Sequence, residues 1–310
     1  MNSTRQGLGD ALVALGDLNK NLVVLTADLA TSTNVSAFAK THPERFYNVG
    51  IAEQNMLGIA AGMAFSGKVP FATTFGVFAT GRAWDQLRTT ICYAKANVKV
   101  AATHCGVTVG EDGATHQSLS DLAVTRSIPH LTILSPCDYN QTKKAVFAAA
   151  EIKGPVYLRL GRTKTPLVTT SETPFKIGGA QVLCEGGDAA IIATGEMVYE
   201  ALMAAQRLAL RRIKATVINI HTIKPIDEDA IKKAALTGLI ITAEDHHIKG
   251  GLGSAVAEVL ADWPGKKKPL QVMVGVEDVF GTSGPAEELM KSFHITSEDI
   301  YNAVLKEKRG

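Results

Sequence analysis

A glutamate at the start of a small, apolar helix is the first candidate for chemistry in this sequence. Glu53 follows the turn at Gly50 and precedes the run Met56 to Phe65, which contains only Met, Leu, Ile, Ala, Gly and Phe. A carboxylate at a helix start has an ordinary explanation, because it interacts with the helix dipole by about 0.3–1 kcal/mol. On a buried helix, however, desolvation raises the pKa of a carboxyl group and equips it to share a proton with a ring nitrogen.

Two aromatic residues lie at the next strand-to-helix junction. Phe75 and Phe78 are close in the sequence, with Gly76 between them. Phenylalanines at such a junction are most often core residues, so this pair alone does not indicate a binding site.

A glycine-rich loop between two histidines is the third candidate. His104 and His116 flank the loop, which carries Glu111 and Asp112. Its glycines, which permit unusual backbone conformations, are Gly106, Gly110 and Gly113. A metal site needs a third and a fourth ligand, and the sequence places none here. Proton relay or substrate contact is therefore the better hypothesis, although a structural role explains each histidine alone equally well.

The elements that must position these residues follow a regular pattern in the first half of the chain. Short β-branched runs alternate with longer helical patterns, which requires crossover connections and predicts a parallel sheet with helices on both faces. The predicted strands are 22–28, 69–75, 98–104, 131–136 and 156–161, and the predicted helices include 53–65, 76–93 and 138–151.

The pattern lapses where Thr, Ser, Pro and Gly predominate and then resumes. Such a change in composition marks a linker. Further strands are predicted at 189–195, 214–220, 238–245 and 270–278, with helices near 196–211, 227–237 and 252–262. We therefore predict an α/β protein with one parallel-sheet domain at residues 1–165, a linker at 166–187 and a smaller α/β domain at 188–310.

Composition narrows the class of protein. A chain of 310 residues with 46% hydrophobic residues can form two buried cores. Lys and Arg number 32 against 30 Asp and Glu, so the charge favours neither nucleic acid nor a membrane surface as a partner. The four cysteines have neither the spacing of a zinc site nor that of a disulfide framework. With no apolar run of membrane-spanning length, these features indicate a soluble, cytoplasmic protein.

Taken in order, these segments resemble the transketolase family. The resemblance extends from about Arg5 to Phe293 and rests on GIAEQNMLGIAAGMA, TTF with a second Phe shortly after, THCGVTVGEDGATHQ, IKPIDEDAI and ITAEDHHIKGGLGSAV. It implies a pyrimidine-binding domain with the thiamine-diphosphate-binding fold, followed by a transketolase C-terminal domain. Transketolases usually carry a further domain that binds the diphosphate and a divalent metal through a GDG motif, and this sequence contains no GDG.

That difference implies a partner. We expect an N-terminal transketolase subunit that holds the diphosphate and Mg²⁺ or Ca²⁺, in a heterotetramer with this chain. Thiamine diphosphate would then lie across the interface between the two kinds of subunit, and this chain would supply no metal ligand.

By position, the resemblance assigns the cofactor contacts. Glu53 corresponds to the glutamate that bonds and exchanges a proton with the pyrimidine nitrogen of thiamine diphosphate. Phe75 and Phe78 correspond to the aromatic walls around the pyrimidine. Asp28 matches an aspartate near the cofactor and the subunit contact.

The resemblance also assigns a sugar-phosphate site. Arg5, Ser32, His104 and Arg162 fall on the positions of the phosphate ligands, and without the resemblance both arginines would be ordinary surface charges. Asp112 corresponds to a residue that contacts a substrate hydroxyl. His116 corresponds to one near the donor carbonyl, which makes it a catalytic candidate together with Glu53 and His104.

The implied function is transfer of a two-carbon ketol unit from a ketose phosphate to an aldose phosphate. The alternatives are a beta subunit of a 2-oxoacid dehydrogenase, a deoxyxylulose-phosphate-synthase-like enzyme, and a regulatory subunit that has kept the fold. A nicotinamide site is not favoured, because Val256 occupies the third glycine position of the motif that begins at Gly251.

Overall fold

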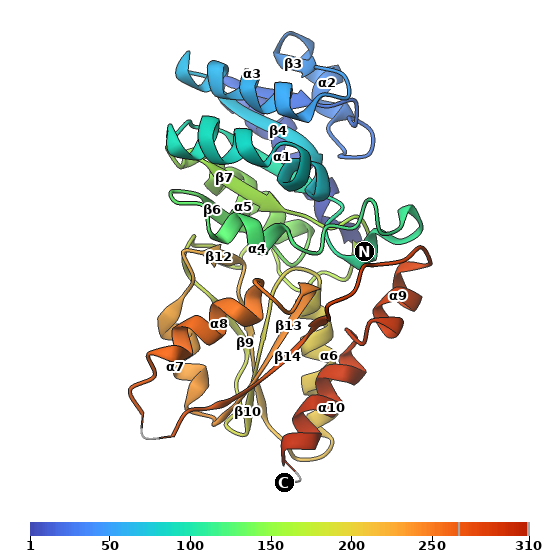
Figure 1. The fold of residues 1–310 in the computed structure, drawn as a ribbon, viewed down its shortest axis with the longest axis vertical. Coiled ribbons are helices and arrows are strands. Elements are labelled where there is room, and N and C mark those ends of the chain that lie inside the picture. The colour runs from blue at the N-terminus through green and yellow to red at the C-terminus, as the bar shows by residue number, and fades with distance from the viewer. Residues whose placement is uncertain (266, 309–310) are drawn as a thin grey trace.

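The first half of the chain forms a seven-stranded sheet. The computed structural model describes residues 1–265 and 267–308, and the sheet occupies its upper half in Figure 1. All neighbouring strands are parallel except β12, which is antiparallel to β6. The order across the sheet is β12 (Thr222–Lys224), β6 (Thr132–Leu134), β7 (Val156–Arg159), β5 (Lys99–Thr103), β4 (Val69–Phe75), β2 (Leu22–Thr26) and β3 (Phe46–Asn48).

Helices cover both faces of this sheet, as the pattern predicts. Helices α1 (Thr4–Leu18) and α5 (Tyr139–Glu151) pack together on one face. Each begins at a side-chain cap, since Ser3 accepts from the Gln6 amide and Asp138 accepts from the Gln141 amide. Helix α3 (Glu53–Phe65) packs on the opposite face, whose core is one continuous apolar cluster.

The predicted helix 76–93 has an irregular form. It consists of two π-helical segments, η2 (Phe78–Arg82) and η3 (Gln86–Tyr93). The hydroxyl groups of Thr80 and Thr89 each donate to the carbonyl four residues earlier, a contact that competes with regular helix bonding. Such π-helical turns are frequent at functional sites.

The second half of the chain forms a five-stranded sheet, which confirms the predicted α/β fold (Figure 1). Its strands are parallel except β9, which is antiparallel to β11. Its order is β14 (Leu270–Val276), β13 (Leu239–His247), β10 (Ala189–Ala193), β11 (Ala215–Asn219) and β9 (Gln181–Cys184). The helices around it are α6 (Met197–Ala209), α7 (Glu228–Ala235), α8 (Leu252–Ala261), α9 (Ala286–Ser292) and α10 (Ser297–Lys308).

The two halves are joined more closely than a simple linker implies. Strand β9 lies inside the segment 166–187 that the sequence predicts as linker, and it is an edge strand of the second sheet. Strand β12 lies beyond that segment, yet it extends the first sheet. The largest apolar cluster also continues across the junction, because it includes Leu57 from α3 and Leu252 from α8.

Short elements complete the fold. Strand β1 (Asn2–Ser3) pairs with β8 (Lys164–Thr165), which brings the start of the chain beside the end of the first half. Further short helices are α2 (Ser36–Thr41), η1 (Pro43–Arg45), η4 (Val107–Asp112) and α4 (Asp121–Arg126). None of the helices in the described ranges has both the length and the hydropathy that a membrane span needs.

Candidate cofactor and substrate site

The candidate cofactor site begins at the first residue of α3. Glu53 is 4% exposed, and its Oε1 atom lies 3.2 Å from Arg82 Nη1. Arg82 reaches it from η2 and is itself 53% exposed. The structure therefore places a buried carboxylate beside a partner that can reach solvent.

The two predicted phenylalanines lie next to this ion pair. Phe75 ends β4 and is buried, while Phe78 begins η2 and is half-buried. Their ring centroids are 5.6 Å apart with an interplanar angle of 16°, so the rings are nearly parallel. The Arg82 guanidinium carbon lies 4.0 Å from the Phe78 centroid, a cation–π contact that links the aromatic pair to Glu53.

His104 stacks on the other side of the aromatic pair. Its ring centroid is 3.8 Å from that of Phe75, and its Nδ1 atom lies 2.9 Å from Thr103 Oγ1. Burial, followed by the positive charges of Arg5 and Arg162, lowers the pKa of His104 to about 3. The imidazole is therefore neutral near pH 7.

His116, at the far end of the glycine-rich loop, returns to the same place. Its ring meets Phe78 edge-on at 5.4 Å and Phe75 at 6.1 Å. The Thr115 hydroxyl lies 3.0 Å from His116 Nδ1. The fold thus brings both predicted histidines to one aromatic pair.

The two predicted arginines lie side by side. Arg5 Nε donates to the backbone carbonyl of Arg162 over 3.1 Å, a contact between residues 157 positions apart. The pairing of β1 with β8 accounts for this contact, because both residues flank that small sheet. Arg5 Nη1 also donates to the carbonyl of Ser32 over 2.7 Å.

Burial and then the neighbouring Arg162 lower the pKa of Arg5. Two guanidinium groups whose charges act on each other are suited to binding a phosphate or another anion.

The loop carboxylates meet these arginines. Arg162 Nη1 donates to the Val109 carbonyl and lies 2.9 Å from Glu111 Oε2. Asp112 is exposed at the end of η4, and its charge opposes the effects of burial and of Arg162 on the pKa of Arg5.

Asp28 lies apart from these contacts. It is exposed after β2 with a φ of 62°, and its hydrogen-bond partner is the Asn48 side chain, at 2.9 Å. The structure records no bond between Asp28 and the other predicted site residues in the described ranges.

Arg82 is a site residue that the sequence analysis missed. Its position four residues after Phe78, on the same face of a helix, is the signal that indicates it.

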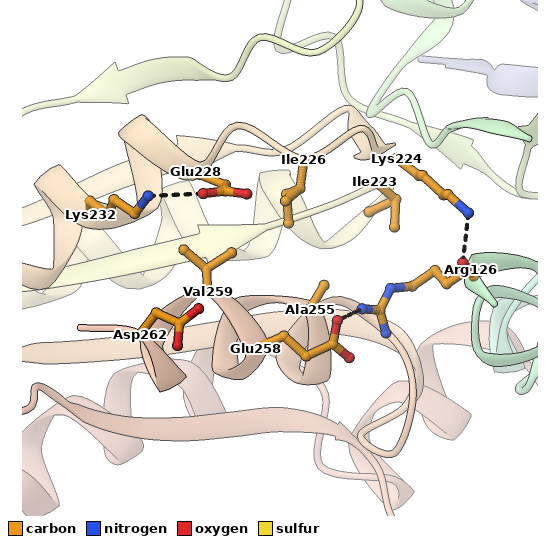
Figure 2. A pocket seen from close by; sticks show the side chains of 10 residues that line it. All are labelled: Arg126, Ile223, Lys224, Ile226, Glu228, Lys232, Ala255, Glu258, Val259 and Asp262. Atoms are coloured by element: carbon orange, nitrogen blue, oxygen red, sulfur yellow. Dashed lines mark hydrogen bonds and ion pairs between the residues drawn. The ribbon is translucent and has the colours of Figure 1, made fainter. Parts of the chain in front are cut away.

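A separate cavity of about 350 Å³ lies where α7 and α8 approach α4 (Figure 2). Arg126 Nη2 contacts Glu258 Oε2 at 2.6 Å on one wall, and Lys224 Nζ donates to the Arg126 carbonyl. None of the predicted site residues lines this cavity.

Comparison with known proteins gives the family. The family model of the transketolase pyrimidine-binding domain matches residues 1–168, and that of the transketolase C-terminal domain matches residues 178–300. The putative transketolase C-terminal section of Methanocaldococcus jannaschii is 48% identical over 307 residues, covering 98% of this chain and 96% of that protein. The 6-deoxy-6-sulfo-D-fructose transketolase subunit of a Clostridium species is 40% identical over 296 residues, with coverage of 95% and 91%.

A solved structure agrees with these matches. It is described as a split gene transketolase, inactive beta4 tetramer, and it superposes with a TM-score of 0.91 at 48% identity. The superposition covers 99% of this chain and 98% of that one. The chain therefore belongs to the transketolase family, of which it contains the pyrimidine-binding and C-terminal domains.

Proposed function

We propose that this chain is the C-terminal subunit of a two-chain transketolase. The enzyme would transfer a two-carbon ketol unit from a ketose phosphate to an aldose phosphate, with thiamine diphosphate as cofactor. One observation carries the proposal: contacts through Arg82 link the buried Glu53 to Phe75, Phe78 and the two histidines, and the charges of Arg5 and Arg162 act on His104.

The residues present fit the pyrimidine ring of thiamine diphosphate. Phe75 and Phe78 offer flat apolar surfaces, and the Glu53 carboxylate is buried at the first turn of α3. Glu53 would hold a proton at a pyrimidine nitrogen, and Asp28 would lie near the cofactor at the subunit contact. When bound, thiamine diphosphate supplies the carbon nucleophile of the reaction.

The remaining residues would bind and orient the sugar. Arg5 and Arg162 would bind the phosphate, with Ser32 beside them. Neutral His104 would exchange hydrogen bonds with the substrate without adding charge. Asp112 would contact a hydroxyl group, and His116, against Phe78, would move protons near the carbonyl that reacts.

The relatives support a separate partner. This chain aligns with 96% of a protein named a C-terminal section and with 98% of a subunit from a split gene. The solved subunit is an inactive tetramer of one kind of chain. We propose that an N-terminal subunit holds the diphosphate and a divalent cation, Mg²⁺ or Ca²⁺, and that two copies of each chain form the active heterotetramer.

Reconstitution tests this proposal. The isolated chain is mixed with the N-terminal subunit, Mg²⁺ and thiamine diphosphate, and ketol transfer between a ketose phosphate and an aldose phosphate is measured. We expect activity in the mixture and none in either chain alone. Activity of the isolated chain would contradict the two-chain enzyme, and carbon dioxide release from pyruvate would indicate a 2-oxoacid dehydrogenase instead. Failure of the assembled pair to bind thiamine diphosphate would favour a regulatory subunit.

Glu53 has its own test. Glu53→Ala and Glu53→Gln should leave folding and partner binding intact, yet lower turnover of the reconstituted enzyme by about 100-fold or more, because general acid–base groups contribute effects of that size. Glu151→Gln, at the exposed end of α5, is the matched control and should behave as wild type. Normal turnover of both Glu53 variants would refute the assigned role.

A further inference from the structure

We infer that Asp245 and Glu196, two buried carboxylates of the C-terminal domain, are positioning residues for the substrate site. Asp245 holds the start of the glycine-rich loop, and Glu196 holds the turn that carries Arg162. The assignment of these segments to substrate rests on the proposed function. The contacts themselves do not, and they can be tested without catalysis.

Asp245 binds the first residues of η4 from β13. It is 5% exposed, and its Oδ1 atom accepts from the Val107 amide over 2.8 Å. Its Oδ2 atom accepts from the Thr108 amide over 3.2 Å and from the Thr108 hydroxyl over 2.9 Å. One carboxylate from the second sheet therefore satisfies three donors at the start of a loop attached to the first sheet.

The loop is shaped to admit that carboxylate. Gly106 has a φ of 91°, and a Cβ atom at this position would collide with Asp245 Oδ2. Both the left-handed backbone and the close approach require glycine here. The backbone at the loop start is thus complementary to the Asp245 side chain.

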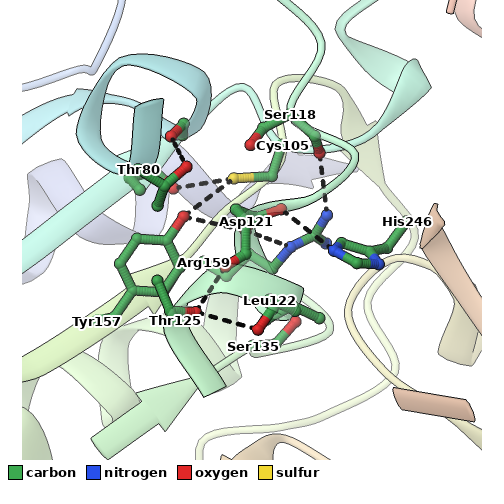
Figure 3. A network of polar contacts seen from close by, with 12 residues as sticks. Thr80, Cys105, Ser118, Asp121, Leu122, Thr125, Ser135, Tyr157, Arg159 and His246 are labelled. Carbon is green, nitrogen blue, oxygen red and sulfur yellow. Dashed lines mark hydrogen bonds and ion pairs between the residues drawn. The ribbon is translucent and has the colours of Figure 1, made fainter. Parts of the chain in front are cut away.

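The backbone of Asp245 is bound by Arg159, which belongs to a buried network of polar contacts (Figure 3). Arg159 Nη2 donates to the Asp245 backbone carbonyl over 2.8 Å, and Arg159 Nε bonds Asp121 Oδ2 over 2.9 Å. Figure 3 shows Arg159 extending between Asp121 and His246, so the guanidinium lies where the two domains meet. Because Arg159 and Asp121 are both buried, they hold the backbone of Asp245 in place, and with it the carboxylate that binds the loop.

Glu196 contacts the second segment through one hydrogen bond and through close packing. It precedes α6, and its Oε2 atom accepts from the Thr163 hydroxyl over 3.1 Å. A Cβ atom on Gly161 would collide with Glu196 Oε1, so the turn from Gly161 to Thr163 packs directly on this carboxylate. Arg162 is the central residue of that turn.

The two held segments meet at the proposed anion site. Arg162 contacts Val109 and Glu111, which both lie on η4. The C-terminal domain also binds the loop further along, because Ser283 Oγ donates to the Glu111 carbonyl over 2.5 Å and Gln117 Nε2 donates to the Thr282 carbonyl over 2.9 Å. The C-terminal domain therefore fixes the positions of the loop and of the Arg162 side chain.

Substitutions can separate positioning from folding. Asp245→Asn keeps the size of the side chain but loses an acceptor for Thr108, and Thr108→Val removes the hydroxyl from the other side. Glu196→Ala removes the second carboxylate, and Thr108→Ser is the conservative rescue that keeps the hydroxyl. Glu258→Gln is the matched control, because Glu258 pairs with Arg126 across the same two domains but lies away from the loop.

Two measurements are made on each variant. Amide hydrogen exchange of residues 106–112 is followed in the full chain without a partner, and KM and kcat for a ketose phosphate are measured in the reconstituted enzyme. Asp245→Asn, Thr108→Val and Glu196→Ala should raise KM about tenfold and change kcat by less than about twofold, since binding groups rather than reacting groups are displaced. Asp245→Asn and Thr108→Val should also speed exchange in the loop, whereas Thr108→Ser and Glu258→Gln should match wild type in both measurements.

The outcomes are distinct. Unchanged KM together with faster exchange would overturn the inference, because the carboxylate would then hold a loop that does not position substrate. Unchanged exchange in Asp245→Asn and Thr108→Val would overturn it as well. If the wild-type pair has no ketol transfer, the proposed function fails, while hydrogen exchange still tests whether Asp245 holds the loop. Thr108→Val supplies the answer if Asp245→Asn does not fold.

Discussion

Glu53 is buried, while the arginine that pairs with it is half exposed. A buried carboxylate that loses its counter-charge is left desolvated, which costs free energy. The exposure of Arg82 weakens the pair through solvent screening. The size of the pair's contribution is therefore modest but measurable.

Substitution of Arg82 gives a first prediction. Arg82→Gln should lower the free energy of unfolding by about 1 kcal/mol, because the buried Glu53 carboxyl group loses its ion-pair partner. Glu53→Gln should cost less, since a neutral amide avoids the desolvation of an ion. Urea denaturation of both single variants and the double variant measures the pair. The reverse order of the two single variants would contradict this account.

His104 gives a prediction about pH. The folded chain binds a proton at His104 only near pH 3, whereas the unfolded chain binds one near pH 6.5. Stability contributed by neutral His104 is therefore complete above pH 6.5 and is lost as the pH falls, by about 2 kcal/mol at pH 5. His104→Asn should remove this loss.

The measurement must separate the contribution of His104 to the pH dependence of stability from the contributions of other buried groups. Burial raises the pKa of both Glu196 and Glu244 to about 7, so these groups make the folded state less stable as the pH rises over the same range. Both glutamates remain in the variant. The quantity to compare is therefore the change in unfolding free energy between pH 7 and pH 5, by urea denaturation of wild type and His104→Asn. An identical change in the two proteins would show that His104 is not held neutral.

At the scale of elements, two helical glycines in different surroundings give opposite predictions. A Cβ atom on Gly9 in α1 would collide with the Asn34 carbonyl, next to the segment that carries Ser32. Gly62 in α3 has open space where its Cβ would lie. Gly9→Ala should lower the free energy of unfolding by about 1–3 kcal/mol through overpacking.

Gly62→Ala is the matched substitution. It should raise the free energy of unfolding of the isolated chain by up to about 1 kcal/mol, because alanine favours the helix and meets no neighbour. Thermal or urea denaturation of the two variants provides the comparison. Destabilisation by both variants would contradict this account, because Gly62→Ala creates no collision that could explain a loss of stability.

Regular strands and helices were predicted well from the sequence, and irregular elements poorly. Strands β4 and β10 and helix α3 lie where periodicity placed them. Strands β9 and β12 were missed, because each is short and owes its place to a partner strand distant in the sequence. The π-helical form within residues 78–93 was missed as well, since the spacing of apolar residues does not reveal the hydrogen bonds of the threonine hydroxyl groups to the backbone.

At the scale of the whole molecule, the two α/β units share buried polar contacts as well as apolar core. Arg159 of the first sheet pairs with Asp121 and bonds the backbone of Asp245 in the second. Both members of the ion pair are almost completely removed from solvent. Loss of one member leaves the other as an uncompensated buried charge.

Arg159 therefore gives a prediction about the assembled fold. Arg159→Gln should lower the free energy of unfolding by about 3–5 kcal/mol, and the double variant with Asp121→Asn should cost less because Asp121 is then no longer a buried charge without its partner. Calorimetry would show one transition in wild type and a separation of the two halves in Arg159→Gln. A single variant more stable than the double would contradict the role of the buried pair.

The sequence by itself determined the alternating strands and helices and the ordered motifs around Glu53, Phe75 and the glycine-rich loop. These features are local, since they depend on periodicity and on residues a few positions apart. Tertiary structure alone decided that Arg5 meets Arg162 and that Arg82 meets Glu53. It also placed Asp245 beneath the loop, 137 or more positions from the residues it binds. Contacts of that separation leave no spacing pattern, because each is fixed by the packing of whole sheets and not by neighbouring residues.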